Sequence, residues 1–255
     1  MQVKYDFSGK NVILVGGTTG IGRATALAFA KAGANLYVSG IGAEFGQSLK
    51  QEVKALGTEI EFEEIDVRDG KAMAKLHQNA FARFGRIDIA FNNAGVPGKT
   101  APVHELEDAD YDLLMDVNLR GIFHGLRNQI PHMIANGGGA IVNIASQAGL
   151  VALPGESSYC VSKAAVIHMT RVHAVEWGGY GIRVNAVAPT FIETDGTADA
   201  LADVSFRADT IERIAALHRI GVPTEVSGAV VFLCSPAASL VTGQTLAIDG
   251  GWTAR

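Results

Sequence analysis

The sequence predicts an α/β fold in which a parallel sheet is covered by helices on both faces. Short apolar runs typical of strands alternate with longer runs typical of helices along the 255 residues, a pattern characteristic of strand–helix–strand units. The apolar runs lack a strict polar alternation, which indicates strands buried on both sides. Hydrophobic residues make up 48% of the chain and charged residues 18%, a balance typical of a folded globular protein.

The predicted elements follow one another with short connections. Strands are predicted over 11–15, 35–39, 59–65, 87–91, 140–145, 182–187 and 244–248. Helices are predicted near 23–33, 43–56, 69–84, 108–135, 157–178 and 224–234. No linker, repeat or low-complexity tract interrupts them, so we expect one domain over residues 1–255.

Residues 190–221 break this alternation. They contain one amphipathic stretch, 207–218, and no strand pattern. Because the segment follows the end of a predicted strand, where ligands of open α/β sheets bind, we expect it to form a substrate loop or lid.

A glycine-rich turn, GGTTGIG over residues 16–22, follows the first predicted strand and opens a helical segment. Such a turn presents backbone N–H groups and the positive end of a helix to a phosphate. Gly16 permits the sharp turn, whereas Gly20 and Gly22 let the backbone approach a ligand closely. The spacing differs from G-x-G-x-x-G and lacks the lysine of a P-loop, so the turn alone indicates only a general phosphate site.

Polar residues follow several of the other predicted strands. They are Asp66-Val67, Asn92-Asn93-Ala94-Gly95, Ser146 and the stretch from Pro189 to Thr194. Because the carboxyl ends of parallel strands meet at one edge of a sheet, we expect these residues to surround one binding crevice. Asp66 is placed to accept a hydrogen bond from an adenine amino group. Asn118 lies within a predicted helix that its amide disfavours, which indicates tertiary hydrogen bonding.

Tyr159 and Lys163 are four residues apart on the predicted helix 157–178, so their side chains share one face. A nearby cation lowers the pKa of a phenol from about 10, which suits a group that takes a proton from an alcohol and returns it to an alkoxide. Ser146, thirteen residues before the tyrosine, is placed to bind the same oxygen. The same spacing is common on helices where the tyrosine is half-buried and the lysine is in water. The spacing alone therefore does not indicate catalysis, and the surrounding motifs must support it.

Composition narrows the partners. The net charge is −5 and no basic stripe is present, which argues against nucleic acid. No segment reaches the length of a membrane span, so no membrane partner is expected. Seven histidines show no metal-ligand spacing, so no metal is expected. Two cysteines and no leader pattern favour a cytoplasmic protein.

The motifs GGTTGIG, NNAG, YCVSK and IDGGWTA, in this order and spacing, resemble the short-chain dehydrogenase/reductase family in its compact form of about 250 residues. The resemblance covers essentially the whole chain. It implies a Rossmann-type, doubly wound sheet of seven parallel strands, a nicotinamide dinucleotide, and a homotetramer built on helices 108–135 and 157–178.

The resemblance also implies a role for each site residue. Tyr159 is the general acid/base and Ser146 positions the substrate oxygen. Lys163 holds the nicotinamide ribose and lowers the tyrosine pKa, and Asn118 anchors a water that relays protons. Asn93, Ala94 and Gly95 line the adenosine side, and Ile192 and Thr194 the nicotinamide carboxamide. The other expected cofactor-binding residues are Gly16, Thr18, Thr19, Gly20, Ile21, Gly40, Ile41, Asp66, Val67 and Pro189.

Two positions depart from the family pattern: Val15 stands where threonine is usual, and Thr190 where glycine is usual. Cofactor selection is less clear. Gly40 replaces the aspartate of NAD-preferring relatives, and Ile41 the arginine of NADP-preferring ones. Without an evident cation for a 2′-phosphate the sequence favours NAD, with NADP left open through Arg23.

The expected reaction moves hydride between a nicotinamide dinucleotide and a neutral secondary alcohol or ketone, small, cyclic or polyhydroxylated. Leu150, Leu153, Phe191 and Phe206 are expected to form an apolar wall. Six acids against three arginines in 190–221 disfavour heavily phosphorylated substrates or acyl carriers. The alternatives are a non-catalytic dinucleotide sensor, a ketoacyl-type reductase using NADPH, and an epimerase or dehydratase.

Overall fold

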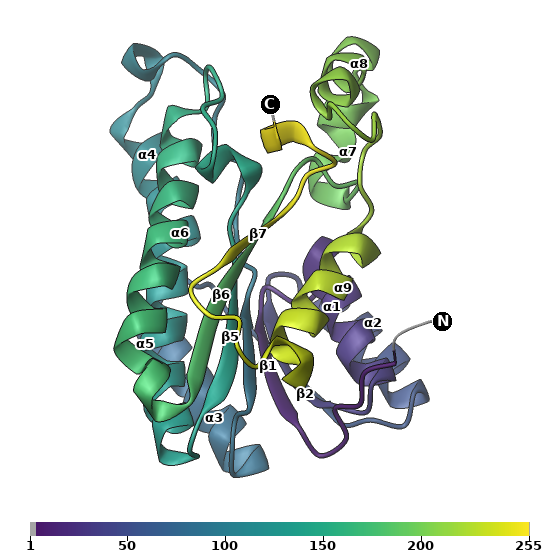
Figure 1. Ribbon diagram of the computed structural model, residues 1–255, viewed down its shortest axis with the longest axis vertical. Helices are drawn as coiled ribbons and strands as arrows, with labels where there is room; N and C mark the ends of the chain where they lie inside the picture. The colour runs from purple at the N-terminus through teal and green to yellow at the C-terminus, as the bar shows by residue number, and fades with distance from the viewer. Residues whose placement is uncertain (1–3, 255) are drawn as a thin grey trace.

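The centre of the computed structural model, which describes residues 4–254, is a parallel sheet of seven strands (Figure 1). The strands are β1 (Asn11–Val15), β2 (Asn35–Gly40), β3 (Ile60–Glu64), β4 (Ile89–Asn92), β5 (Gly139–Ile144), β6 (Ile182–Pro189) and β7 (Thr245–Ile248). Their order in the sheet is β3-β2-β1-β4-β5-β6-β7. Successive strands are added on one side of β1 up to β3 and on its other side from β4 onward, and such a change of side creates the ligand crevice of an open sheet. The predicted strands and fold class are confirmed. The ends of the predicted domain, residues 1–3 and 255, lie outside the described residues.

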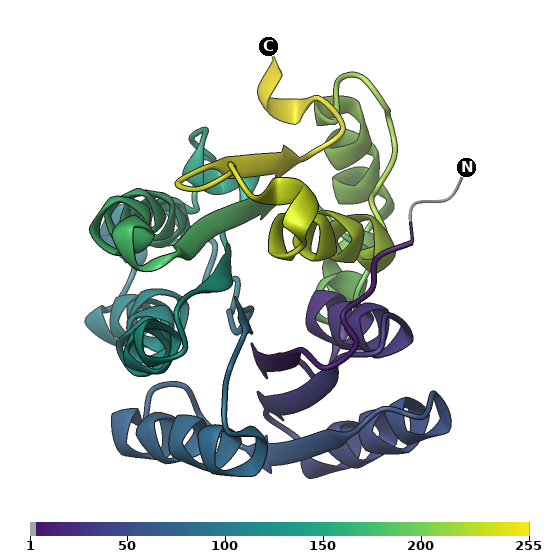
Figure 2. The same cartoon turned by 60° about the horizontal axis from the view of Figure 1, so that its bottom comes forward.

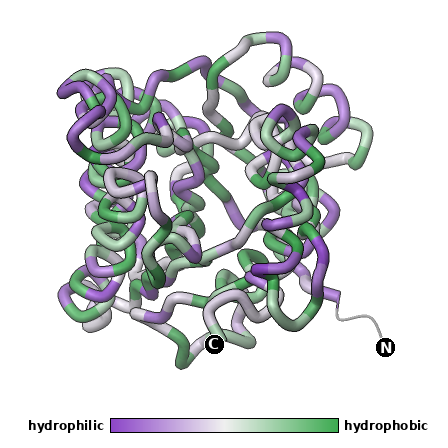
Figure 3. The backbone as a smooth tube through the Cα atoms, turned by 90° about the horizontal axis from the view of Figure 1, so that it is seen from above, coloured by the Kyte–Doolittle hydropathy of each residue, from purple (hydrophilic) through white to green (hydrophobic). Residues whose placement is uncertain are grey.

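Helices cover both faces of the sheet (Figures 1 and 2). Along β1, Val12 and Leu14 pack with one layer, whereas Ile13 and Val15 pack with the other, as the alternation of a strand requires. The first layer consists of α1 (Gly20–Lys31), α2 (Ala43–Ala55) and α9 (Pro223–Cys234). The second consists of α3 (Gly70–Phe84), α5 (Gly121–Ala135) and α6 (Ser157–Trp177). Hydrophilic and hydrophobic positions alternate along these outer helices (Figure 3), so each helix buries one face.

The predicted helix 108–135 is interrupted. α4 (Asp108–Met115) ends in a π-helical turn over Asp116–Arg120, after which α5 begins. Asn118 lies in this turn and binds the backbone of Val96 twice, accepting from its N–H at 2.8 Å and donating to its carbonyl at 2.9 Å. The expected tertiary hydrogen bonding of Asn118 is therefore confirmed. Turns of this kind are frequent at functional sites.

The segment 190–221 contains two helices, α7 (Asp195–Ala202) and α8 (Val204–Arg213), so the prediction of one helix over 207–218 was wrong. Local hydrogen bonding divides the segment. Thr194 starts α7 in a capping box with Thr197, and the Asp203 carboxylate accepts from the Phe206 N–H at 2.9 Å to start α8. The apolar side chains that hold the segment against the C-terminus are Leu201, Ile214, Ile220 and Trp252.

Short 3₁₀ turns complete the chain at Val103–Glu105, Gln147–Gly149, Gly178–Tyr180, Pro236–Ala238 and Trp252–Ala254. Within residues 4–254, every helix falls short of the length or the apolar character needed to cross a bilayer.

A buried polar chain links the second helix layer to the sheet. Gln129 on α5 donates to Asn92 Oδ1 at 2.7 Å, and Asn92 donates to Asn143 Oδ1 at 2.9 Å. Asn143 then donates to Thr170 Oγ1 on α6 at 3.1 Å. At the other end, His77 Nε2 lies 3.2 Å from Gln129 Nε2 and its Nδ1 lies 2.7 Å from the Met73 carbonyl. Burial lowers the pKa of His77 to about 4, and the neutral tautomer with a proton on Nδ1 satisfies both contacts.

We expect Gln129→Leu to destabilise the protein by about 2–4 kcal/mol, because it leaves Asn92 and His77 with unmet acceptors in a dry interior. Chemical denaturation measures the free energy of unfolding. Gln51→Leu, on the exposed face of α2, is the matched control and should change stability by less than about 0.5 kcal/mol. Equal effects of the two substitutions would contradict a stabilising role of the chain.

Candidate active site

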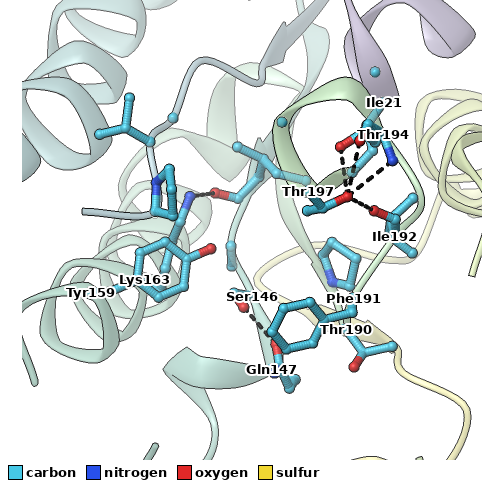
Figure 4. A pocket seen from close by; sticks show the side chains of 18 of the residues that line it. Ile21, Ser146, Gln147, Tyr159, Lys163, Thr190, Phe191, Ile192, Thr194 and Thr197 are labelled. Atoms are coloured by element: carbon cyan, nitrogen blue, oxygen red, sulfur yellow. Dashed lines mark hydrogen bonds between the residues drawn. The ribbon is translucent and has the colours of Figure 1, made fainter. Parts of the chain in front are cut away.

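A cavity of about 330 Å³ opens at the carboxyl edge of the sheet, between α6 and the segment that begins at Pro189. Figure 4 shows Tyr159 and Lys163 on one side of it and Ile21, Ile192 and Thr194 on the other. The expected site residues that line it are Thr19, Gly20, Ile21, Asn93, Gly95, Ser146, Tyr159, Lys163, Pro189, Ile192 and Thr194. Segments distant in the sequence therefore meet at one point, because parallel strands end at a common edge.

Ser146 is held by the 3₁₀ turn that follows β5. Its Oγ accepts a hydrogen bond from the Ala148 N–H at 3.2 Å and donates to Gln147 Oε1 at 2.6 Å. Ser146 is 5% exposed, and the two bonds fix its hydroxyl direction. The hydroxyl is thus oriented within the cavity rather than free to rotate.

Tyr159 and Lys163 lie one helical turn apart on α6. Lys163 Nζ is 5.7 Å from the centroid of the Tyr159 ring and donates to the Ile144 carbonyl oxygen at 3.3 Å. Lys163 is only 3% exposed, an unusual position for a lysine, whose ammonium group normally stays in water.

Burial dominates the titration of both groups. It raises the pKa of Tyr159 to about 12, with the Ser146 hydroxyl acting to lower it and the Glu156 carboxylate to raise it. It lowers the pKa of Lys163 to about 8. The expected lowering of the tyrosine pKa by Lys163 is therefore not present in this structure. The physical reason is that desolvation disfavours both the phenolate and the ammonium.

Asn118 does not line the cavity. It lies behind Gly95, where an added Cβ would meet Asn118 Oδ1 at 3.3 Å and Lys163 Nζ at 3.4 Å. Its amide is occupied by the Val96 backbone. The water-relay role of Asn118 stays a prediction, and its observed contacts fix the loop that follows β4.

A second cavity, of about 480 Å³, adjoins the first and shares Thr19, Asn93, Gly95 and Val96 with it. Together the cavities form an elongated site along the edge of the sheet, as a two-part ligand such as a dinucleotide requires. The expected cofactor-binding residues that line the second cavity are Gly16, Thr18, Thr19, Gly40, Ile41, Asp66, Val67, Asn93, Ala94 and Gly95.

The glycine turn fits a phosphate-bearing ligand. A Cβ at Gly16 would lie 2.5 Å from the Ala94 nitrogen, so only glycine lets the turn close against the loop after β4. Asn93 Nδ2 donates to the Gly16 carbonyl at 2.7 Å and locks that contact. α1 begins at Gly20, inside the turn rather than at residue 23, and the Thr19 hydroxyl makes no capping bond. The first N–H groups of α1 therefore have no capping hydroxyl, and Gly20 and Ile21 at this helix start line the first cavity.

Two charged residues that the sequence analysis considered for cofactor contacts have partners within the chain. The Asp66 carboxylate lines the second cavity but is paired with Arg68, whose Nη2 lies 2.6 Å from Oδ2, and this partner holds the Asp66 pKa below its usual range. Arg23, the expected candidate for a 2′-phosphate, instead pairs with Glu52 at 2.6 Å and Ser48 at 3.0 Å.

The apolar wall is smaller than expected. Leu153 and Phe191 line the first cavity. Leu150 is 41% exposed and lies outside the lining, and Phe206 reaches the site only through its ring contact with Phe191. Thr190 lines the cavity, and its buried Oγ1 has no partner among the described residues.

Sequence reasoning did not assign Arg68, beside Asp66, to the second cavity, or Gln147 and Glu156 to the first. Each of them lies within three residues of a predicted site residue, and this proximity in the sequence could have identified them. Among residues 4–254 no cluster of histidine, cysteine and acidic side chains is arranged to hold a metal ion.

Comparison with known proteins agrees with this geometry. A family model described as enoyl-(acyl carrier protein) reductase matches residues 15–253. The chain is 39% identical to the 3-oxoacyl-[acyl-carrier-protein] reductase of Thermotoga maritima, over 95% of this chain and 97% of that protein. It is 38% identical to the D-threitol dehydrogenase of Mycolicibacterium smegmatis, over 99% of this chain and 97% of that protein.

Among solved structures, a gluconate 5-dehydrogenase from Burkholderia cenocepacia in complex with NADP and tartrate matches with a TM-score of 0.93 and 33% identity, over 99% of this chain and 98% of that one. The site and these relatives agree in fold, extent and chemistry. The chain belongs to the short-chain dehydrogenase/reductase family and is an oxidoreductase that moves hydride between a nicotinamide dinucleotide and an alcohol or ketone.

Proposed function

We propose that Tyr159 exchanges a proton with the substrate oxygen, while Ser146 hydrogen-bonds the same oxygen. The observation that supports these roles is that Ser146, Tyr159 and Lys163 all line the first cavity, with Ser146 and Lys163 buried. A phenol accepts the alcohol proton during oxidation and returns it during reduction. Ser146 donates its hydroxyl proton to Gln147 Oε1, so in this proposal the hydroxyl turns from Gln147 to the substrate oxygen when the substrate binds.

Lys163 has a binding role in this proposal. Its Nζ lies 5.7 Å from the centroid of the Tyr159 ring on a side chain that is 3% exposed, and we propose that it holds the nicotinamide ribose beside the phenol. The nicotinamide dinucleotide, when bound, supplies or accepts the hydride. The residues proposed to hold it are the glycine turn 16–22, Asn93, Ala94 and Gly95, together with Lys163, Pro189, Ile192 and Thr194.

We propose NAD rather than NADP as the preferred cofactor. The Glu64 carboxylate accepts from the Gly42 N–H at 2.8 Å, so a negative charge occupies the backbone donor at the end of β2. The two nearby cations, Arg23 and Arg68, are already paired with carboxylates. In this proposal a 2′-phosphate at this end of the second cavity is disfavoured, because the Glu64 carboxylate holds the Gly42 N–H and both Arg23 and Arg68 already have carboxylate partners.

We propose a neutral secondary alcohol or ketone as substrate. Leu153 and Phe191 supply apolar contacts in the first cavity, and Lys163 is its buried cation. The similarity to a 3-oxoacyl reductase keeps a ketoacyl substrate as a second candidate. The exposed acids of α7 and α8 disfavour an acyl-carrier partner, which is itself acidic.

We also propose that the protein forms homotetramers and resides in the cytoplasm. Exposed apolar side chains on α4, α5 and α6 support assembly: Leu113 on α4, Phe123 on α5, and Val172 and Val175 on α6. Patches of this kind mark protein–protein contacts. The unpaired cysteines Cys160 and Cys234 support a reducing compartment.

We expect Tyr159→Phe to lower kcat by roughly three orders of magnitude or more, because it removes the proton-exchanging group. Binding of NADH, measured by fluorescence, should change by less than about threefold, since the hydroxyl group is a small part of that contact surface. Tyr180→Phe, at an exposed tyrosine, is the matched control. Wild-type turnover by Tyr159→Phe would refute the role of the phenol.

A paired titration with NADH and NADPH tests the cofactor proposal. The dissociation constant for NADH should be lower by about tenfold or more, equivalent to about 1.4 kcal/mol. Glu64→Gln keeps an acceptor for the Gly42 N–H but removes the charge, so it should reduce the difference between the NADH and NADPH dissociation constants. Glu59→Gln, immediately before β3, should leave that difference unchanged. Tighter binding of NADPH by the wild type would overturn the proposal.

Light scattering of the purified protein should give about four times the chain mass of 26.7 kDa. Val175→Asp places a charge on an exposed apolar position of α6 and should lower that mass. Val204→Asp, at a similarly exposed valine on α8, should leave the mass unchanged. A monomeric wild type at micromolar concentration would exclude the tetramer.

A further inference from the structure

Glu156 places a carboxylate in the substrate cavity. The residue immediately precedes α6 and lines the first cavity together with Tyr159. A tight turn over Leu153-Pro154-Gly155-Glu156 fixes its backbone: the Glu156 N–H donates to the Leu153 carbonyl at 3.1 Å, and Gly155 has a φ of 81°. Proline followed by glycine at the centre is typical of a type II turn.

This carboxylate is half-buried and makes no hydrogen bond or ion pair with any side chain or N–H group of residues 4–254. Burial raises its pKa above the usual range. By contrast, Asp66 and Glu225 elsewhere in the molecule each face an arginine. An unpaired carboxylate in a partly dry cavity destabilises the fold, and groups of this kind are concentrated at functional sites.

Gln147 offers the complementary group. Its Oε1 accepts from Ser146 Oγ, whereas its Nε2 has no acceptor within the part of the chain that the structure describes. The residue is 3% exposed and lines the same cavity. An uncommitted donor and an uncommitted acceptor therefore flank the site of Ser146 and Tyr159.

A hydroxyl group is the ligand chemistry that satisfies both, since it donates one hydrogen bond and accepts another. An ammonium group would bind the Glu156 carboxylate but could not accept a hydrogen bond from Gln147. A substrate carboxylate would be repelled by Glu156. We infer that Glu156 and Gln147 bind a second hydroxyl group of the substrate, so that the enzyme acts on diols or hydroxyketones rather than on monofunctional alcohols. The inference deepens the proposed function and rests on it, because it places the reacting oxygen at Ser146 and Tyr159.

Matched six-membered rings test this inference. We would measure kcat/KM with NAD for trans-cyclohexane-1,2-diol, cyclohexanol and trans-2-aminocyclohexanol, and their equilibrium binding to the NADH complex by ligand-observed NMR. The wild type should favour the diol over cyclohexanol by about tenfold or more, because bound cyclohexanol leaves Glu156 and Gln147 without hydrogen-bond partners. Glu156→Leu should reduce this ratio to within about threefold in both measurements.

Glu176→Leu, at an exposed glutamate near the other end of α6, is the matched control and should keep the wild-type ratio. Turnover without a diol preference, or a preference that survives Glu156→Leu, would overturn the inference while leaving the oxidoreductase assignment intact. A preference for the amino alcohol over the diol would show that the site favours an ammonium group over a hydroxyl group, and this result would also overturn the inference. Selective diol binding without turnover would support the inference and count against the proposed catalytic roles.

Discussion

Parallel pairing of all seven strands is the constraint on which the site depends. It brings the carboxyl ends of β1, β4, β5 and β6 to one edge, so the glycine turn, the loop after β4, Ser146 and the start of the segment 190–221 become neighbours. The buried chain from His77 to Thr170 then fixes α6 against β4 and β5. Because α6 carries both Tyr159 and Lys163, hydrogen bonds of the protein interior help to hold these two residues in place.

Features encoded in local patterns could be predicted from the sequence. The strands, the glycine turn and the i, i+4 spacing of Tyr159 and Lys163 depend on periodicity and on residue type. The π-helical turn at Asn118 and the division of 190–221 into α7 and α8 could not be predicted, because each is set by side-chain bonds to particular backbone groups. The pKa of Tyr159 was mistaken for a related reason: spacing reveals a neighbouring cation, whereas desolvation depends on the packed structure.

Charge is distributed unevenly between the two cavities. Around the second cavity the cations are paired and Glu64 covers a backbone donor. In the first cavity, Lys163 is buried and Glu156 is half-buried. In the cofactor proposal, the first arrangement disfavours an additional negative charge on the ligand. In the substrate proposal, the second leaves polar groups available to a substrate that supplies the missing hydrogen bonds.

The contact between Gly40 and Thr18 constrains how this site can change during evolution or engineering. A Cβ at position 40 would overlap the Thr18 side chain, and Thr18 is almost completely buried. An aspartate at position 40 therefore requires the Thr18 side chain to shift. Since the two positions are in contact, substitutions at them should not be additive, and each is best assessed in the background of the other.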